Sequence, residues 1–427
     1  MINIKHISDN YLCSNCGACS FICPNNAIYF KDTSIGRLYA EVNGNCVQCG
    51  MCERVCPSID VLGIHNENDN SLVGIINKVY VGKCSDQKLF KNAQSGGAAS
   101  AVVAYLLDTK KVDAALLCVM KGNEHPKGEP MVITKTIDVA KSQKSCYTPV
   151  PLLVGLKDCV EYERIVVVGL PCQIEALTLL ERQNKLPNLK YKIGLICDRM
   201  MCGTLTDVMM SLSHVNSGKI DWRRKDFSHH KKYYPYKTAP VVVYDKKNTK
   251  VIPNSYRFSL KEMFTPPRCR ICYDKLNTFA DITVGDPWGM SGVDWNKGAS
   301  LILTRTLLGQ ELLAEMIEGG VLEVTEKPLN EVIDGQHINR RFFQVKVFSS
   351  ILKPFMAHSN SFLFDGCFNE IEKEETFVFL SKEFSRFREN EKLDKREIIS
   401  KARKQVFHDR FMSRLYSIKA SIGRLLR

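Results

Sequence analysis

Three features are missing from this sequence of 427 residues. No run of about 18 apolar residues occurs, which argues against a membrane-spanning helix. The opening stretch, MINIKHISDNYLC, lacks the apolar core of a secretory signal peptide. The basic residues are not accompanied by aromatic platforms or a nucleic-acid-reading fold, so we do not expect nucleic acid as a partner. These absences together place the expected location of the chain in the reducing cytoplasm.

Cysteine, in contrast, is abundant. The chain has 18 cysteines, and eight of them lie in the first 56 residues. The rest of the composition, with 44% hydrophobic and 25% charged residues, is that of a globular protein and rules out wholesale disorder. Because a reducing compartment disfavours disulfides, this many cysteines indicates metal or redox chemistry.

The first 62 residues contain two copies of one pattern, CSNCGACSFICP and CVQCGMCERVCP. Three cysteines at this spacing can wrap one cubane cluster, and the fourth, followed by proline, ligates the neighbouring cluster. Zinc sites, the alternative, usually take two cysteine pairs that lie far apart. The pattern is similar to that of bacterial dicluster ferredoxins. It predicts two [4Fe–4S] clusters, one held by Cys13, Cys16, Cys19 and Cys56, and the other by Cys46, Cys49, Cys52 and Cys23.

From about Ile75 onward, short apolar runs such as RIVVVGL and KIGLIC alternate with helical stretches such as QIEALTLLERQ. Strands alternating with helices indicate α/β layers. The predicted fold class is therefore α/β, or α+β over the whole chain. It comprises a bacterial-type dicluster ferredoxin domain, a layered α/β core and a helical, basic C-terminal region. The expected units are residues 1–62, 75–155, 156–335 and 336–427.

The core carries four further motifs. Gln94-Ser95-Gly96-Gly97 opens a helix, where free N–H groups can bind an anion such as a phosphate, or the glycines can simply form a cap. The segment ADITVGDPWG ends a strand in a turn that Asp286 is expected to cap. The other two motifs are rich in cysteine. They predict a third [4Fe–4S] cluster held by Cys172, Cys197, Cys269 and Cys272. Cys202 is the alternative to Cys197 as the fourth ligand. A zinc site, a redox dithiol or buried free thiols are the alternatives to a cluster.

The order and spacing of these motifs resemble the family of coenzyme F420 hydrogenase/dehydrogenase beta subunits over about residues 8–310. The resemblance rests on AQSGG (93–97), KSCY (144–147), PCQ (171–173), the strand ending in Cys197, the CRIC pair (269–272) and ADITVGDPWG (280–289). In KSCY a cysteine stands between the usual serine and tyrosine. That family is similar in carrying FAD and an additional cluster in its core. The resemblance implies flavin contacts at Ser95, Gly96, Gly97, Lys144, Ser145 and Tyr147, and the additional cluster at Cys172, Cys197, Cys269 and Cys272.

The resemblance implies an iron–sulfur flavoprotein oxidoreductase. Such a protein would pass electrons, through FAD and the clusters, between a hydride carrier and one-electron carriers. The hydride carrier would be reduced F420 or another small redox substrate. The expected partner is a ferredoxin or the subunits of a redox complex. A flavin-free electron-transfer or docking subunit is one alternative, and a ferredoxin-dependent reductase that uses Cys269 and Cys272 as a dithiol is another. No catalytic side chain is assigned, because hydride transfer to a flavin does not require a protein base.

The net charge is +13, and the segment 391–427 carries 11 basic against 4 acidic residues. Its apolar residues form one helical stripe, which we expect to pack on the protein itself or in a dimer. The alternative is that the helix contacts an acidic partner or lies on an anionic membrane surface, such as the inner face of the cell membrane. The basic runs 222–225 and 229–232 are expected to be solvated loops, or at most a patch for an acidic ferredoxin. The stripe consists of Phe411, Leu415, Ile418, Ile422 and Leu425.

Overall fold

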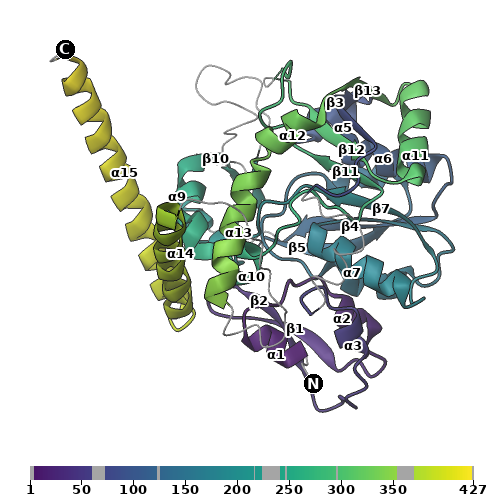
Figure 1. Ribbon diagram of the computed structural model, residues 1–427, viewed down its shortest axis with the longest axis horizontal. Helices are drawn as coiled ribbons and strands as arrows, with labels where there is room; N and C mark the ends of the chain where they lie inside the picture. The colour runs from purple at the N-terminus through teal and green to yellow at the C-terminus, as the bar shows by residue number, and fades with distance from the viewer. Residues whose placement is uncertain are drawn as a thin grey trace.

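The computed structural model describes residues 4–59, 73–122, 126–215, 217–223, 241–245, 248–294, 297–352 and 370–425 (Figure 1). Residues 4–59, which we call the N-terminal segment, consist of short helices, loops and one antiparallel hairpin in which Ile28 pairs with Val42. So few regular elements leave most of its backbone in loops, as a segment built around cysteine motifs requires. Its elements are α1 (Ile4–Asp9), α2 (Ala18–Ile22), β1 (Ile28–Asp32), β2 (Leu38–Val42) and α3 (Met51–Arg54).

A mixed sheet of eight strands, in the order β13-β3-β12-β11-β7-β6-β4-β5, forms the centre of the molecule. The four strands β11, β7, β6 and β4 run parallel, and antiparallel strands flank them on both sides. The apolar runs of the sequence become the inner strands because both faces of such strands are covered. The strands are β3 (Lys78–Cys84), β4 (Ala114–Lys121), β5 (Lys127–Ile133), β6 (Ile165–Gly169), β7 (Leu189–Leu195), β11 (Ile282–Gly285), β12 (Ser300–Thr304) and β13 (Leu322–Glu326).

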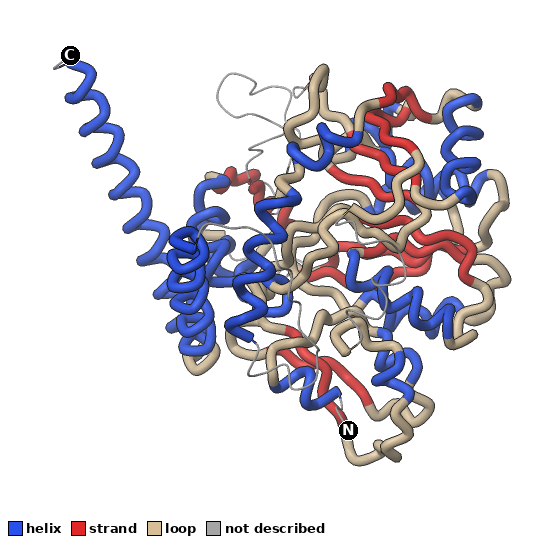
Figure 2. The backbone as a smooth tube through the Cα atoms, viewed as in Figure 1, coloured by secondary structure: helices blue, strands red, loops and turns tan. Residues whose placement is uncertain are grey.

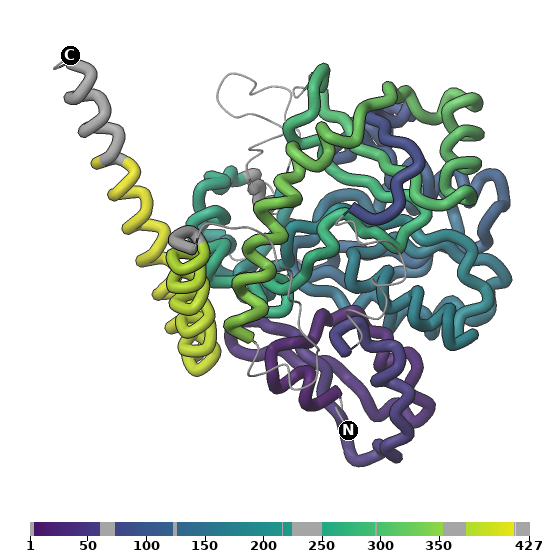
Figure 3. The backbone as a smooth tube through the Cα atoms, viewed as in Figure 1, coloured from purple at the N-terminus to yellow at the C-terminus, as the bar shows by residue number. Residues whose placement is uncertain are grey.

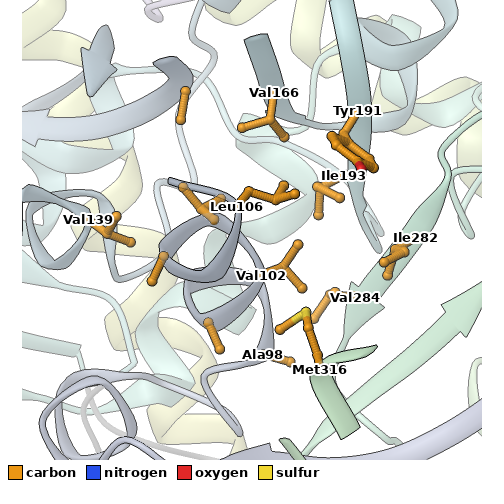
Figure 4. Packing of buried hydrophobic residues seen from close by; sticks show 14 of the residues in the cluster. Ala98, Val102, Leu106, Val139, Val166, Tyr191, Ile193, Ile282, Val284 and Met316 are labelled. Atoms are coloured by element: carbon orange, nitrogen blue, oxygen red, sulfur yellow. The ribbon is translucent and has the colours of Figure 1, made fainter. Parts of the chain in front are cut away.

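Helices cover both faces of this sheet, so the predicted α/β layering is confirmed (Figure 2). On one face, Val102 of α6 and Met316 of α11 join Val166 and Ile193 of the strands in one buried cluster (Figure 4). The opposite face packs against α7 and η2. The covering elements are α5 (Gln87–Asn92), α6 (Ala98–Asp108), η1 (Thr136–Ser142), η2 (Leu152–Cys159), α7 (Pro171–Arg182) and α11 (Leu307–Glu318).

The N-terminal segment packs against the α7 face of the sheet. Cys16, Ala18 and Val55 belong to the same buried apolar cluster as the residues of α7 and η2. The backbone N–H of Leu153, in η2, donates a hydrogen bond to the carbonyl of Cys16 over 2.9 Å. The first cysteine motif is therefore part of the core packing and not an appended module.

A second, smaller sheet has the order β10-β9-β8 and lies among α8, α9 and the last helix. Trp222 and Phe264 are fully buried in the apolar cluster that these elements share. The elements of this region are α8 (Thr204–Ser213), β8 (Lys219–Asp221), β9 (Val241–Asp245), β10 (Asn248–Ile252), α9 (Asn254–Phe264), α14 (Glu370–Asn390) and α15 (Lys395–Leu425). Further helices are α10 (Pro267–Arg270), α12 (Leu329–Gly335) and α13 (Ile338–Leu352).

The N-terminal segment packs against the last two helices. Ile35 of the N-terminal segment lies in the same apolar cluster as Phe387 of α14 and Ile398 of α15. Beside this cluster, Arg37 Nε lies 2.5 Å from Glu391 Oε1, and both side chains are nearly buried. The hairpin of α14 and α15 thus covers one side of the N-terminal segment (Figure 3).

The last helix continues beyond α14, away from the body of the molecule (Figure 1). In the apolar stripe predicted there, Phe411 is 61% and Leu415 38% exposed. The expectation that the stripe packs on the protein's own surface is therefore wrong at these two residues. The side chains of Ile418, Ile422 and Leu425 lie outside the described part. None of the described helices is both long and apolar enough to cross a bilayer.

Candidate functional site

The first copy of the cysteine motif is buried. Gly17, at φ 97°, precedes α2 and turns the chain so that Cys16 and Cys19 both face inward, each 7% exposed. Burial raises the pKa of the Cys16 thiol to about 11 and that of Cys19 well above its usual range. The charges of Cys16, Cys13 and Cys56 raise the pKa of Cys19 further. The thiols that act on Cys19 therefore come from both copies of the motif.

The second copy lies at the surface. Gly50, at φ 72°, precedes α3 as Gly17 precedes α2. Cys46 and Cys49 are exposed, whereas Cys52 is partly buried. Burial first, and then the charges of Glu53, Cys23 and Cys46, raise the pKa of Cys52 to about 11. Cys23, from the first copy, thus lies with the thiols of the second.

Four more thiols converge at one edge of the large sheet, where the parallel strands end. Cys172 lies in the first turn of α7 just after β6, and Cys197 follows β7. Cys269 lies in α10, and Cys272 follows it. Burial raises the pKa of Cys197 and that of Cys172, and the charges of Cys269 and Cys272 contribute to the shift at Cys197. The carboxyl edge of parallel strands is where α/β sheets ordinarily bind their ligands.

Cys202, the alternative to Cys197, has different surroundings. Its side chain is fully buried in the apolar cluster with Leu205 and Phe264, and its N–H donates to the carbonyl of Phe264 over 2.8 Å. Cys269 affects the pKa of both cysteines, but only at Cys197 do both members of the CRIC pair contribute to the shift. In the described part of the chain, no three His, Cys, Asp or Glu side chains lie close enough to hold a single metal ion.

A buried arginine connects the core thiols with the N-terminal segment. The Arg268 side chain is almost fully buried, and its Nε donates to Ser58 Oγ over 3.1 Å. Its charge favours the thiolates of Cys272 and Cys56, one from each group of thiols. Its Nη1 has no hydrogen-bond partner in the described part. A buried cation with an unused N–H beside several thiolates fits an anionic iron–sulfur cluster, because cluster sulfurs accept hydrogen bonds.

A second arginine and an asparagine fix the backbone around the core thiols. Arg341 of α13 donates through Nη2 to the carbonyls of Cys269 and Cys272, the latter over 2.9 Å. Asn277 donates through Nδ2 to the carbonyls of Gly169 and Leu195, over 2.9 and 3.2 Å, and so ties together the ends of β6 and β7. The sequence analysis assigned no role to Arg268, Arg341 or Asn277. Arg268 directly precedes Cys269, but its contact with the distant N-terminal segment has no local signal, and neither do the contacts of Arg341 and Asn277.

The two motifs assigned to a flavin lie together at the same edge of the sheet. The N–H of Ser145 donates to Gln94 Oε1 over 2.7 Å. Asp221, at the end of β8, accepts from Gln94 Nε2 over 2.7 Å and pairs with Lys144 Nζ at 3.0 Å. The buried carboxylate of Asp221 therefore joins the 94–97 turn to the 144–147 loop and balances the lysine charge.

The glycine turn is packed more tightly than an open anion site. The Gly96 N–H donates to Ser300 Oγ over 3.0 Å, so it is not free for a phosphate as the motif suggested. A Cβ on Gly96 would lie 2.3 Å from the carbonyl oxygen of Gly82. Ser95 Oγ donates to the carbonyl of Ala299 over 2.6 Å. Gly97, at φ 81°, starts α6. The turn thus anchors the start of α6 to strands β3 and β12.

Tyr147 is held between Trp222 and Arg257. Its ring meets the indole of Trp222 edge to face, with centroids 5.6 Å apart, and the Arg257 guanidinium lies 4.6 Å from its centroid.

The expectation of a solvated loop at 222–225 is wrong at its start, because Trp222 is fully buried and Arg223 pairs with Asp286 at 2.7 Å. The basic neighbours favour a surface position for this segment, although the size of the tryptophan favours burial. Residues 224–225 and 229–232 lie outside the described residues.

Comparisons with known proteins agree with this arrangement. The profile of the coenzyme F420 hydrogenase/dehydrogenase beta subunit matches the chain in two parts, the N-terminal part at residues 79–157 and the C-terminal part at residues 162–329. The 4Fe-4S dicluster domain matches residues 12–59. All four groups of residues described above lie within or beside these matches.

Two curated proteins illustrate the relationship. The coenzyme F420-dependent sulfite reductase of Methanocaldococcus jannaschii is 28% identical over 346 residues, which cover 76% of this chain and 49% of that protein. The chain therefore spans about half the length of this relative. One of the subunits of the F420H2 dehydrogenase of Methanosarcina mazei is 26% identical over 338 residues, covering 76% of this chain and 87% of that protein.

A solved structure shares the fold. A chain of the F420-reducing [NiFe] hydrogenase complex from Methanosarcina barkeri superposes with a TM-score of 0.51 at 20% identity, covering 67% of this chain and 93% of that chain. This similarity is one of fold, and it covers two thirds of this chain. The chain belongs to the family of coenzyme F420 hydrogenase/dehydrogenase beta subunits, and a 4Fe-4S dicluster domain precedes its core.

Proposed function

We propose that this protein is an iron–sulfur flavoprotein that connects a two-electron hydride carrier, reduced F420 or a related small molecule, with one-electron carriers. The observation that carries the proposal is the position of Cys172. Its pKa is raised by burial, then by the charge of Cys272 and next by that of Cys16, a thiol of the N-terminal segment. Cys172 Sγ also lies 3.8 Å from the carbonyl oxygen of Ser14. The core thiols and the dicluster segment therefore form one connected site.

Three groups of thiols would hold three clusters. The inner cluster takes Cys13, Cys16, Cys19 and Cys56; the outer cluster takes Cys46, Cys49, Cys52 and Cys23; the core cluster takes Cys172, Cys197, Cys269 and Cys272. The inner group lies beside the core group, and the outer group reaches the surface. This arrangement supports a path that runs from the core through the inner to the outer cluster, with a ferredoxin or another protein of a redox complex docking at the exposed end. Relatives are named as subunits of dehydrogenase and hydrogenase enzymes, which favours such a partner.

FAD is the proposed two-electron cofactor. When bound, a flavin exchanges a hydride with its substrate and passes on single electrons to clusters. Lys144 supplies a partly exposed ammonium for the pyrophosphate, and Ser145 and Tyr147 stand on the same loop. Trp222 Nε1, buried against Tyr147, has no hydrogen-bond acceptor among the described residues, so it can donate to a bound ligand. Ser95, Gly96 and Gly97 would shape the floor of the site by fixing the start of α6.

Iron and flavin analysis of protein purified without oxygen tests this composition. Three cubane clusters correspond to about twelve iron atoms per chain, and denaturation should release one FAD. About twelve iron atoms without flavin would favour the alternative of a flavin-free electron-transfer subunit. Zinc in place of iron would overturn both readings.

Serine variants test the ligands of the core cluster. Cys197→Ser should remove about four of the twelve iron atoms, whereas Cys202→Ser, a matched change in the apolar cluster nearby, should remove none. Cys269→Ser should behave as Cys197→Ser does. Unchanged iron in Cys269→Ser, together with lost activity, would instead support a catalytic dithiol at Cys269 and Cys272.

The substrate is tested by reduction without oxygen. F420H2, NADPH, NADH and reduced ferredoxin are added in parallel, and bleaching of the flavin and cluster absorbance is followed. Fast bleaching by F420H2 is the expected result. Bleaching by reduced ferredoxin alone would favour a ferredoxin-dependent reductase of another substrate.

A further inference from the structure

Two cysteines that belong to none of the three cluster groups lie against each other. Cys118 is on β4, near the end that faces the carboxyl edge of the sheet, and Cys146 is the cysteine within the KSCY motif. Both are partly exposed and neither is in a disulfide. Each thiol is the largest influence on the pKa of the other.

A glycine on the neighbouring strand makes the room for this contact. A Cβ on Gly128 of β5 would lie 2.6 Å from Cys146 Sγ and 3.1 Å from Cys118 Sγ. Both sulfurs therefore occupy the space that any other residue at position 128 would fill. Cys146 Sγ also lies 3.3 Å from the carbonyl oxygen of Thr148 and 3.4 Å from its Oγ1. The pair is enclosed by β4, β5 and the 144–148 loop and has a defined geometry.

The two thiols differ in acidity. The neighbouring Cys118 thiol lowers the pKa of Cys146 to about 7, and the Cys146 thiol, together with burial, raises the pKa of Cys118. Among the other cysteines outside the cluster groups, burial raises the pKa of Cys159 to about 12 and that of Cys202 well above its usual range. A thiol that ionises near neutral pH, next to one that stays protonated, is the arrangement of an attacking and a resolving cysteine.

We propose that Cys118 and Cys146 form a redox-active dithiol that exchanges with disulfide substrates, separate from the iron–sulfur clusters. The Cys146 thiolate attacks one sulfur of a disulfide RSSR, forming a mixed disulfide and releasing RS⁻. The Cys118 thiol then loses its proton and attacks Cys146 Sγ, which forms the Cys118–Cys146 bond and releases the second RS⁻. The two thiols lose two electrons and two protons, and RSSR is reduced to two RSH.

The position of the pair makes it adjacent to the proposed cofactor loop. Cys146 is flanked by Ser145, whose N–H is bonded to Gln94, and by Tyr147, which packs on Trp222. A disulfide would link this loop covalently to β4. The proposal stands on the thiol contact alone and does not require a flavin, so its test can succeed or fail independently of the proposed function.

Oxidised glutathione, added without oxygen to the cluster-loaded full chain, is the probe. After free thiols are alkylated, peptide mass analysis should show one Cys118–Cys146 disulfide that dithiothreitol reverses. Cys118→Ser should instead trap one glutathione on Cys146, and Cys146→Ser should leave Cys118 unmodified. Cys159→Ser, a matched change at a buried thiol of η2, should still form the Cys118–Cys146 disulfide. Absence of the disulfide in the unaltered chain, or equal glutathione uptake by the two single variants, would overturn the proposal.

The pH dependence of alkylation gives a second readout that does not depend on the disulfide. The rate of iodoacetamide reaction at Cys146 should reach half of its maximum near pH 7 in the unaltered chain. In Cys118→Ser the midpoint should change, because the neighbouring thiol is replaced. An unchanged midpoint with an unchanged rate in this variant would show that the two sulfurs do not act as a pair.

Discussion

The two copies of the cysteine motif have the same cysteine spacing but opposite surroundings. In the first copy, Cys16 and Cys19 are buried against the core, and a Cβ on Gly17 would lie 2.8 Å from the carbonyl oxygen of Pro151. In the second copy, Cys49 is exposed, and a Cβ on Gly50 would meet no atom within 4 Å. The same cysteine spacing is therefore compatible with a buried and with an exposed setting, and the packing around each copy determines which one it has. The following predictions test this division.

Gly17→Ala should have the largest effect. The added methyl would meet the backbone of Pro151 and Val154, which cannot move aside as a side chain can, and alanine would be strained at φ 97°. Left-handed strain and overpacking together correspond to roughly 2–5 kcal/mol. We expect loss of the inner-cluster iron and faster limited proteolysis of the N-terminal segment. Iron content and proteolysis equal to those of the unaltered chain would show that the close packing at Gly17 is not required.

Arg268→Met should shift potentials at the inner and core clusters but not at the outer one. The Arg268 charge favours the thiolates of Cys56 and Cys272, so its removal disfavours the added electron at both clusters. A unit charge a few ångströms away at an effective dielectric of about 20 changes a potential by on the order of 100 mV, here toward more negative values. Electron paramagnetic resonance during a redox titration measures each cluster. Arg268→Lys, which keeps the charge, is the control, and an equal shift of all three clusters would contradict the assignment.

Chelation should separate the outer cluster from the other two. Cys46 and Cys49 are exposed, whereas three of the inner thiols are buried and the core thiols are partly buried. In the oxidised protein, a water-soluble iron chelator should remove about a third of the iron several-fold faster than the rest, because exposed metal is reached without unfolding. Iron release followed by absorbance, with the remaining clusters identified spectroscopically, provides the measurement. Release in a single phase would mean that exposure does not distinguish the clusters.

Gly50→Ala should have the smallest effect. The position has φ 72°, so alanine is strained, but the added methyl meets nothing. A cost of about 1 kcal/mol is expected from the backbone alone. Thermal unfolding should show a small decrease, and the iron content should stay at that of the unaltered chain. A loss of iron as large as in Gly17→Ala would remove the distinction between the two copies.

The sequence was sufficient where the chemistry or the packing is local. The cysteine spacing predicted two clusters, and apolar runs such as RIVVVGL predicted strands that the structure contains. Contacts between distant segments could not be predicted in this way. Arg268 reaches Ser58 across 210 residues, and Arg341 reaches Cys272 across 69. The basic residues that follow Trp222 led to the prediction of a surface loop, although the tryptophan itself is buried. A side chain that supports a site from a distant segment can be identified only once the fold is known.

The ion pair between Arg37 and Glu391 has a consequence for synthesis of the chain. These residues are 354 positions apart, and they join the N-terminal segment to the hairpin of α14 and α15. At about 5–20 residues per second, a ribosome adds Glu391 roughly 20–70 s after Arg37. During that interval the nascent segment has its cysteines but not the helices that later cover it. Under the proposed function, a cluster formed in that interval would lie in a segment that the last two helices do not yet cover.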